Sequence, residues 1–252
     1  MANLYYREGL PAPAFAAGAT IEIDGDEAHH AVRVSRLRVG ERILVGNGAG
    51  VLAEGDVTVV EKQRFAVQID RVHEHARPAT RLTLVQALAK GDRDERAVEQ
   101  ATEFGVDAIS PWGAERSVSR WTGAEKAERG TAKWQRIARE AAKQSLRAWL
   151  PEVTDQLGID DFAAAAARED TAVLVLHPRG ETALSAWAAG AQGLPLAEIR
   201  VVIGPEGGFS DAELDTLEAA GATILVLGET VLRTSSAGPA ALAVLNVALG
   251  RW

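Results

Sequence analysis

The sequence contains no cysteine, which excludes disulfide bonds, thiolate zinc sites and cysteine nucleophiles. It also lacks any apolar run of the roughly 18–20 residues that a membrane-spanning helix requires, so we expect no membrane contact. Residues 1–15 do not show the basic flank and apolar core of a secretory signal. These absences predict a cytoplasmic protein, and its 252 residues can bury one large core or two smaller ones.

The acidic excess of the chain is confined to its C-terminal part. Residues 1–152 hold 22 basic and 22 acidic side chains, whereas residues 153–252 hold 5 and 13, which accounts for the net charge of −8. Phosphate contacts come from local basic patches, so the global charge does not exclude nucleic-acid binding. One such patch lies in the neutral part and contains Arg33, Arg36, Arg38 and Arg42.

The first 75 residues or so have the pattern of β structure. The segments IEIDG, ERILVGNG, VLAEGDVTVVE and RFAVQIDRVHEH are short, rich in Val and Ile, and separated by Gly-containing turns. Their spacing favours a small barrel, interrupted by a helical patch at residues 27–37. Arg77-Pro78 marks a boundary, so we predict domains at residues 1–76 and 77–252.

Beyond the boundary, strands and helices alternate. The expected strands are LTLVQALAK, VDAISPW, TAVLVLHP, IRVVIGPEGG and ATILVLG, and the expected helices cover residues 92–104, 133–149, 182–189, 211–220 and 237–249. This alternation predicts an α/β fold with a mostly parallel sheet covered on both faces. The helix at 211 has the clearest signals, because Ser210 and Glu213 form a capping box and Gly221 closes its C-terminus.

The segment IGPEGGFS, residues 203–210, lies between a strand end and this helix, where open α/β sheets bind ligands. Its three glycines permit close backbone approach. It lacks the Gly-Lys-Ser/Thr ending of a P-loop and the spacing of a dinucleotide fingerprint. A tight strand–helix turn without a ligand explains the glycines equally well.

A second loop, LGETVLRTSSAGP at residues 227–239, carries Arg233 beside three hydroxyl residues. Taken alone it could equally be an N-capping segment with a surface arginine. Because both loops follow strands of one sheet, a shared pocket is the better interpretation.

Two further groups of residues suggest nucleic-acid contacts. The helix at 133–149 carries Arg136, Arg139 and Arg147, and Arg116 precedes it, although a charged helix face is usually only solvated. His29-His30 could suggest a metal, but no third ligand stands at a useful spacing, so we expect no metal. Phosphate contact by His29, Arg33, Arg36 and Arg38 is more plausible.

The two loops, as IGPEGGFSDAE and LGETVLRTSSAGPAALAVLN, resemble the trefoil-knotted SPOUT methyltransferases. They most resemble the RsmE-type branch, which methylates N3 of uridine 1498 in 16S ribosomal RNA. Three other segments match that branch in order: HHAVRVSRLRVGER, QALAKGDRDERAVEQATEFGVDAISPWGAERSV and KWQRIAREAAKQSLRAWLPEV. The resemblance therefore covers essentially the whole chain.

The resemblance implies an N-terminal PUA-like β-barrel that binds RNA and a C-terminal SPOUT α/β domain with a deep trefoil knot at about residues 201–246. It further implies S-adenosyl-L-methionine as cofactor, 16S ribosomal RNA within the 30S subunit as partner, and a homodimer formed through the C-terminal domain. The implied cofactor residues are Leu176, His177, Ile203, Gly204, Pro205, Glu206, Gly207, Gly208, Leu227, Gly228, Val231, Leu232, Thr234 and Ala237.

Methylation at N3 of uridine requires loss of the N3 proton, which leaves negative charge on the base. Arg233 is the candidate that stabilises this charge and orients the base, because a guanidinium is too basic to accept the proton. The family commonly has a glutamate where Ser235 stands, so a base role for that position is in doubt. Glu206 is the nearest carboxylate in sequence, and it is either a catalytic group or a structural one.

Three alternatives stay open at this point. A SPOUT enzyme could act on another base or on a 2′-hydroxyl. A non-catalytic RNA-binding assembly factor could keep the same fold, although the glycine loops and Arg233 argue against it. A nucleotide-dependent enzyme of doubly wound type is disfavoured by the missing phosphate fingerprints.

Overall fold

The computed structural model describes residues 3–252, and its contacts divide the chain into two units. The N-terminal unit comprises Met1–Arg77 and Ala142–Leu150, and the C-terminal unit comprises Pro78–Ala141 and Pro151–Trp252. Within residues 3–252, no helix is both long enough and apolar enough to cross a membrane.

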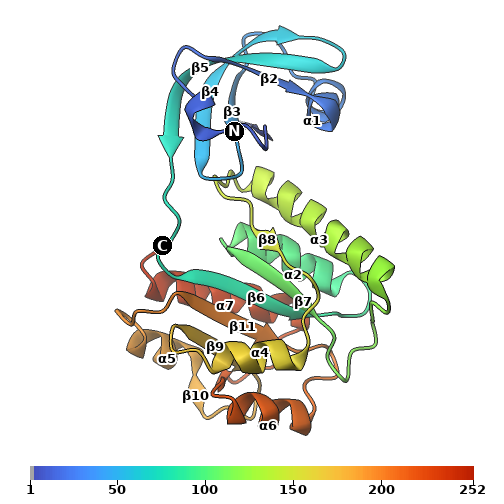
Figure 1. Ribbon diagram of the computed structural model, residues 1–252, viewed down its shortest axis with the longest axis vertical. Coiled ribbons are helices and arrows are strands. Elements are labelled where there is room, and N and C mark those ends of the chain that lie inside the picture. The colour runs from blue at the N-terminus through green and yellow to red at the C-terminus, as the bar shows by residue number, and fades with distance from the viewer. Residues whose placement is uncertain (1–2) are drawn as a thin grey trace. The chain divides into compact units, whose positions relative to one another are not determined.

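The N-terminal unit is a curled five-stranded sheet in the order β1–β3–β4–β5–β2 (Figure 1). Neighbouring strands are antiparallel except for β1 and β3. The helix α1 (Gly25–His29) and the π-helical turn η2 (His30–Val34) follow β2, and a short turn η1 (Ala12–Ala14) precedes it. The strands are β1 (Leu4–Tyr6), β2 (Thr20–Asp24), β3 (Arg42–Gly46), β4 (Val51–Val60) and β5 (Arg64–Glu74).

Alternation along β1 directs side chains into two separate cores of this unit. Tyr5 packs with Ile23, Ile43 and Phe65 in the main core, which α1 and η2 also cover. Leu4 and Tyr6 point to the other face, where they pack with Ala142 and Ala148. The segment Ala142–Leu150 is thus part of the N-terminal unit, although it lies far along the chain.

The C-terminal unit is built on a seven-stranded sheet in the order β10–β12–β9–β11–β6–β7–β8, and every pairing is parallel. The predicted α/β fold with a parallel sheet is therefore confirmed. The strands are β6 (Arg81–Ala87), β7 (Ala108–Trp112), β8 (Glu152–Val153), β9 (Thr171–Leu176), β10 (Thr182–Ala183), β11 (Glu198–Ile203) and β12 (Thr223–Val226).

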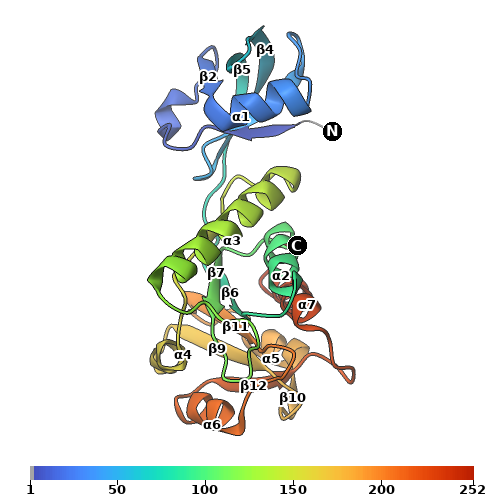
Figure 2. The same ribbon diagram turned by 90° about the vertical axis from the view of Figure 1, so that its right-hand side faces the viewer.

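Helices cover both faces of this sheet (Figures 1 and 2). Leu84, Leu174 and Val201 pack against α2, α3, α5 and α7, whereas Val85, Val175 and Val202 pack against α4 and α6. Adjacent strand residues alternate between two cores, as expected for a sheet buried on both sides. The helices are α2 (Arg93–Glu103), α3 (Ala124–Gln144), α4 (Ile159–Ala166), α5 (Leu184–Gly190), α6 (Asp211–Ala219) and α7 (Thr234–Ala248).

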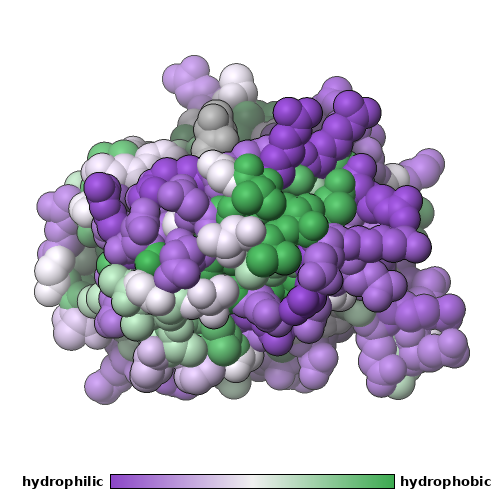
Figure 3. Space-filling model, turned by 90° about the horizontal axis from the view of Figure 1, so that it is seen from above, coloured by the Kyte–Doolittle hydropathy of each residue, from purple (hydrophilic) through white to green (hydrophobic). Residues whose placement is uncertain are grey.

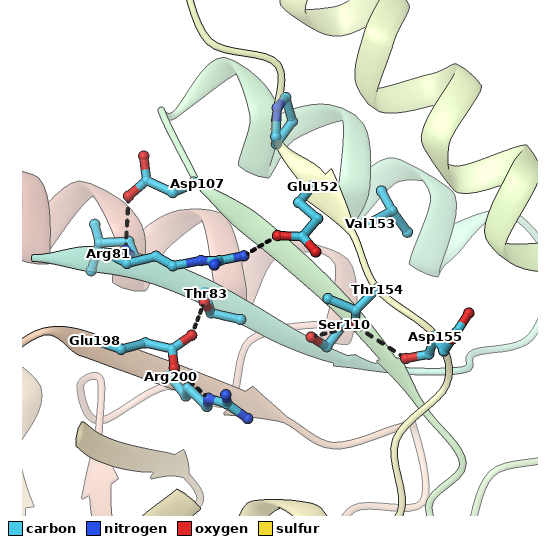
Figure 4. A network of polar contacts seen from close by, with 12 residues as sticks. Arg81, Thr83, Asp107, Ser110, Glu152, Val153, Thr154, Asp155, Glu198 and Arg200 are labelled. Atoms are coloured by element: carbon cyan, nitrogen blue, oxygen red, sulfur yellow. Dashed lines mark hydrogen bonds and ion pairs between the residues drawn. The ribbon is translucent and has the colours of Figure 1, made fainter. Parts of the chain in front are cut away.

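Polar contacts join the strands near their first residues (Figure 4). Thr83 donates to Glu198 at 2.5 Å across β6 and β11, and Arg200 pairs with the same carboxylate at 2.9 Å. Arg81 pairs with Glu152 of β8 at 2.5 Å. These contacts join the strands at their amino-terminal ends. The loops that extend from the opposite ends of the strands are therefore not part of this network.

The predicted capping box of α6 is confirmed. The Glu213 N–H donates to Ser210 Oγ at 3.2 Å, and the Ser210 N–H donates to Glu213 Oε2 at 2.8 Å. Gly221 follows the helix with φ of +101°.

The bounds predicted for three other helices were wrong. The helix predicted at 133–149 is α3, which begins earlier and ends at Gln144, because Leu146 adopts a left-handed conformation with φ of +54°. The helix expected from 182 begins at Leu184, after the short strand β10. The helix α7 begins at Thr234 rather than 237, and α4 was not predicted. The threading of the chain through a knot stays a prediction.

Candidate functional site

The site lies where β12, β9 and β11, three neighbouring strands, end. The loops that follow them line two adjoining cavities of about 570 and 320 Å³. The two linings share Leu176, His177, Pro178, Val231, Leu232 and Ala237. Every residue predicted to bind the cofactor lines one or both cavities. The two loops identified in the sequence therefore meet in one cleft, and the roles of its residues stay predictions.

The glycine loop between β11 and α6 is a tight turn in which the backbone approaches its neighbours closely. The Gly208 N–H donates to the Pro205 carbonyl at 2.9 Å, and Gly208 has φ of +68°. A Cβ atom at Gly207 would lie 3.0 Å from the Arg116 side chain and 3.1 Å from its carbonyl oxygen. Larger residues at Gly207 would push this loop out of place.

Glu206 fastens this loop to the start of α2. Its carboxylate accepts from the Lys90 N–H at 3.1 Å and pairs with Arg93 at 2.6 Å. Burial alone would raise the pKa of Glu206, but hydrogen bonds from backbone N–H groups and from Arg93 outweigh it and hold the pKa below its ordinary value. The Glu206 carboxylate is therefore charged and already engaged by Lys90 and Arg93. This arrangement suits holding the loop in position better than transferring a proton.

Thr234 connects the two loops through its buried hydroxyl. The hydroxyl donates to the Gly204 carbonyl at 2.7 Å and accepts from Gln86 Nε2 at 2.8 Å. One side chain thus joins the end of β6, the glycine loop and the first residue of α7. The helix lies close to β6 because Gly238 faces Leu84, and a Cβ atom there would lie 2.7 Å from a Leu84 methyl.

Arg233 is the N-cap residue of α7, where its carbonyl accepts from the N–H groups of Ser236 and Ala237. Its side chain is exposed, lines the larger cavity, and makes no hydrogen bond or ion pair with the described residues. The guanidinium is therefore available to a ligand in the cavity. Ser235, in the first turn of α7, is half-buried.

His177 follows β9 and contributes a neutral imidazole to the wall. The Arg179 N–H donates to its Nδ1 at 3.1 Å, which assigns the ring proton to Nε2. Burial, followed by the nearby Arg179 charge, lowers the pKa of His177 from its ordinary value. At neutral pH the side chain is a hydrogen-bond donor without charge.

The cleft also contains residues that were not predicted, among them Arg93 and Phe209. Phe209 stacks on Trp112 with ring centroids 5.5 Å apart and meets the His177 ring edge-on at 6.0 Å. Arg93 lines the larger cavity from α2. The sequence contained a signal for Arg93, because this residue lies just after the predicted strand that forms β6. The strand β6 pairs with β11, which leads into the glycine loop.

The residues predicted to contact RNA are divided between the two units, and their role stays a prediction. His29, Arg33, Arg36 and Arg38 are exposed in the N-terminal unit. The face in Figure 3 carries a hydrophobic patch bordered by hydrophilic side chains. Arg147 belongs to the same unit and is half-buried. In the C-terminal unit Arg116 and Arg136 are exposed, and Arg139 pairs with Glu140 at 3.2 Å. Among residues 3–252 no group of three or more His, Asp or Glu side chains could hold a metal.

Comparison with known proteins adds to this geometry. A family model described as an RNA methyltransferase domain matches residues 76–246, and one described as an RNA methyltransferase PUA domain matches residues 23–70. The ribosomal RNA small subunit methyltransferase E of Mycobacterium bovis is 38% identical, over 100% of this chain and 94% of the relative.

The solved structures that match almost the whole chain include two with a bound cofactor. A methyltransferase from Legionella pneumophila in complex with the cofactor SAM has a TM-score of 0.84 at 29% identity, covering 98% of each chain. The ribosomal RNA small subunit methyltransferase E of Neisseria gonorrhoeae, bound to S-adenosyl methionine, has a TM-score of 0.82 at 26% identity, again covering 98% of each chain.

Proposed function

Because the chain belongs to the RNA methyltransferase family, we propose that it transfers a methyl group from S-adenosylmethionine to ribosomal RNA of the small subunit. The observation that carries the proposal is the cleft itself, where the glycine loop and the Arg233 loop meet beside the end of β9. A relative named ribosomal RNA small subunit methyltransferase E and two structural neighbours with bound S-adenosylmethionine support the proposal.

The cleft fits the cofactor in both size and chemistry. Its cavities of about 570 and 320 Å³ lie within the range of small-molecule sites, which are largely apolar with a few placed polar groups. Leu176 and Leu232 supply apolar walls, and the glycine loop supplies a backbone surface. When bound, the cofactor supplies an electrophilic methyl group on a sulfonium.

We further propose N3 of a uridine, at position 1498 of 16S ribosomal RNA, as the methyl acceptor. Removal of the N3 proton leaves negative charge that a fixed guanidinium stabilises, and Arg233 lies exposed in the larger cavity with no competing partner among the described residues. We assign Glu206, engaged by Lys90 and Arg93, to holding the glycine loop. Orientation of the base against the methyl donor is then the main contribution to rate.

Residues 1–76 are proposed to bind RNA as the PUA-like domain, and residues 77–252 to form the SPOUT domain. The C-terminal unit leaves large apolar side chains exposed at Leu194, Val247 and Trp252, with exposures of 53%, 63% and 62%. We propose that this unit forms a homodimer, which light scattering on the purified protein would detect as twice the 26.7 kDa chain mass.

The experiment that tests the function combines binding, activity and mapping. Calorimetry with S-adenosylmethionine should show binding, and the protein should methylate 30S subunits from a strain that lacks the orthologous enzyme. Mass mapping of the 16S RNA should locate one added methyl group at uridine 1498, on the base. A methyl group on another base or on a ribose would overturn the uridine assignment, and cofactor binding without any transfer would favour an assembly factor.

A further inference from the structure

The N-terminal unit contains a small cavity of its own, lined by residues far in sequence from the glycine loop and the Arg233 loop. Its volume is about 70 Å³, and Tyr5, His30, Ser35 and Lys143 line it. All four belong to the N-terminal unit, Lys143 through the segment Ala142–Leu150. The proposed chemistry of methyl transfer uses none of them.

Two buried polar atoms in this cavity lack a hydrogen-bond partner among the described residues, namely Tyr5 Oη and His30 Nδ1. Tyr5 is 2% exposed. Burial raises the pKa of the Tyr5 phenol, an effect that the nearby Ser35 and Asn3 side chains oppose, so the phenol keeps its proton at neutral pH. It is therefore a buried donor that requires an acceptor, and buried donors are rarely left without one.

A buried ammonium group, paired with a carboxylate, lies over the Tyr5 ring. Lys143 is 5% exposed, its Nζ lies 5.9 Å from the centre of the Tyr5 ring, and it pairs with Glu27 at 3.2 Å. Ser35, which also lines the cavity, is exposed to solvent. A compact ligand rich in acceptor oxygens, such as a phosphate group, matches a phenol donor, an imidazole nitrogen and an ammonium group.

The backbone on both sides of the cavity is unusual. Among residues 3–252, the only non-glycine residues with positive φ are Arg36 at 55° and Leu146 at 54°. Arg36 directly follows Ser35, and Leu146 itself lines the cavity. Such conformations are costly for these residue types and often occur at binding sites. Arg33, Arg36 and Arg38, which we expect to contact RNA, lie in the same stretch of chain.

We propose that this cavity binds one phosphate group of the RNA backbone, with Tyr5 and His30 donating to its oxygens. The proposal rests on the proposed function, because it takes RNA to be the substrate. The exposed arginines of the same segment are expected to contact RNA phosphates at the surface. The cavity is a separate subsite, in which buried groups hold one phosphate.

Tyr5→Phe tests the subsite, and Tyr6→Phe is its matched control. Tyr6 is equally buried, but its hydroxyl already donates to the Arg147 carbonyl at 2.7 Å. We expect Tyr5→Phe to weaken binding of a 16S RNA fragment about tenfold, measured by fluorescence anisotropy, without lowering the unfolding temperature. Tyr6→Phe should lower the unfolding temperature and leave RNA affinity within twofold of the wild type.

Inorganic phosphate serves as a second probe, followed through the ¹⁵N resonances of the His30 imidazole. Millimolar phosphate should shift these resonances in the free protein and not in the RNA-saturated protein. Unchanged RNA affinity in Tyr5→Phe would overturn the proposal. This holds even if free phosphate shifts the His30 resonances, because the cavity would then bind phosphate but not RNA. Methylation of 30S subunits by the wild type is measured alongside, so failure of the subsite and failure of the proposed function are distinguished. Absence of RNA binding by the wild type would overturn both.

Discussion

At the scale of single residues, Arg233 is the side chain on which the proposed chemistry depends most directly. We expect Arg233→Ala to reduce kcat by about 10²–10³-fold, because the variant lacks a positioned cation that stabilises developing charge. The dissociation constant for S-adenosylmethionine should stay within a few-fold of the wild type, since Arg233 is assigned to the base. Single-turnover methylation of 30S subunits and calorimetry measure the two quantities separately.

The control for this change is Arg168→Ala, which removes an exposed arginine paired with Asp170 at 3.1 Å, just before β9 begins. It should leave both quantities unchanged. Near-normal turnover of Arg233→Ala would contradict the role of Arg233 in stabilising charge on the base. A large loss of cofactor affinity would instead assign Arg233 to cofactor binding.

Residues of the cleft could be named from the sequence where they lie in local motifs. Gly204, Glu206 and Arg233 stand in two loops whose composition is unusual in itself. The contact between Gln86 and Thr234 joins residues 148 positions apart, and no local pattern indicates that these two residues pair. The Glu206 carboxylate likewise accepts a hydrogen bond from Arg93, which lies 113 positions away in the sequence. Roles that arise from such distant pairs become visible only in three dimensions.

At the scale of secondary-structure elements, α6 holds the glycine loop in place through its capping box. Ser210→Ala removes the acceptor for one N–H, so we expect a loss of about 1 kcal/mol in the free energy of unfolding. Glu213→Ala should cost more, roughly 2–4 kcal/mol, because two N–H groups lose their acceptor at once. These are the N–H groups of Ser210 at 2.8 Å and Glu115 at 2.7 Å.

Urea unfolding measures both losses, and Glu218→Ala on the same helix is the control. Glu218 is exposed and pairs with Arg179 at 3.2 Å, so its replacement should change the free energy of unfolding by no more than about 1 kcal/mol. Equal losses for Ser210→Ala and Glu213→Ala would show that the Glu115 contact contributes nothing.

The contrast between α6 and α3 explains which helix ends can be predicted. The ends of α6 carry residue types that suit their positions, Ser210 at the start and Gly221 after the end. The end of α3 has the same hydrogen-bond pattern, since the Leu146 and Arg147 N–H groups donate to Lys143 and Ala142. Leucine occupies the position that normally favours glycine, so the sequence shows no stop before Pro151. Packing of Leu146 within the N-terminal unit compensates for the strained conformation.

At the scale of the whole molecule, the chain separates its charges along its length, with an acidic excess confined to residues 153–252. The sequence indicated this division and the order of a β-rich part before an α/β part. It did not indicate that Ala142–Leu150 belongs to the N-terminal unit, because that depends on Tyr6 and Trp149 contacting residues more than 70 positions away. Lys143, which lines the small cavity, reaches it through this segment.

The division of charge predicts how RNA binding responds to salt. Replacing Arg33, Arg36 and Arg38 together by glutamine should lower the slope of log affinity against log salt by about 0.7–0.9 for each RNA phosphate that the variant no longer neutralises. Cofactor affinity should not change, because the cleft lies in the C-terminal unit. Arg64→Gln is the control, since Arg64 is already neutralised by Glu61 at 2.8 Å and Glu22 at 3.1 Å. If the triple variant kept the wild-type slope, the RNA phosphates would have to be held elsewhere, and the arginines of the C-terminal unit would become the candidates.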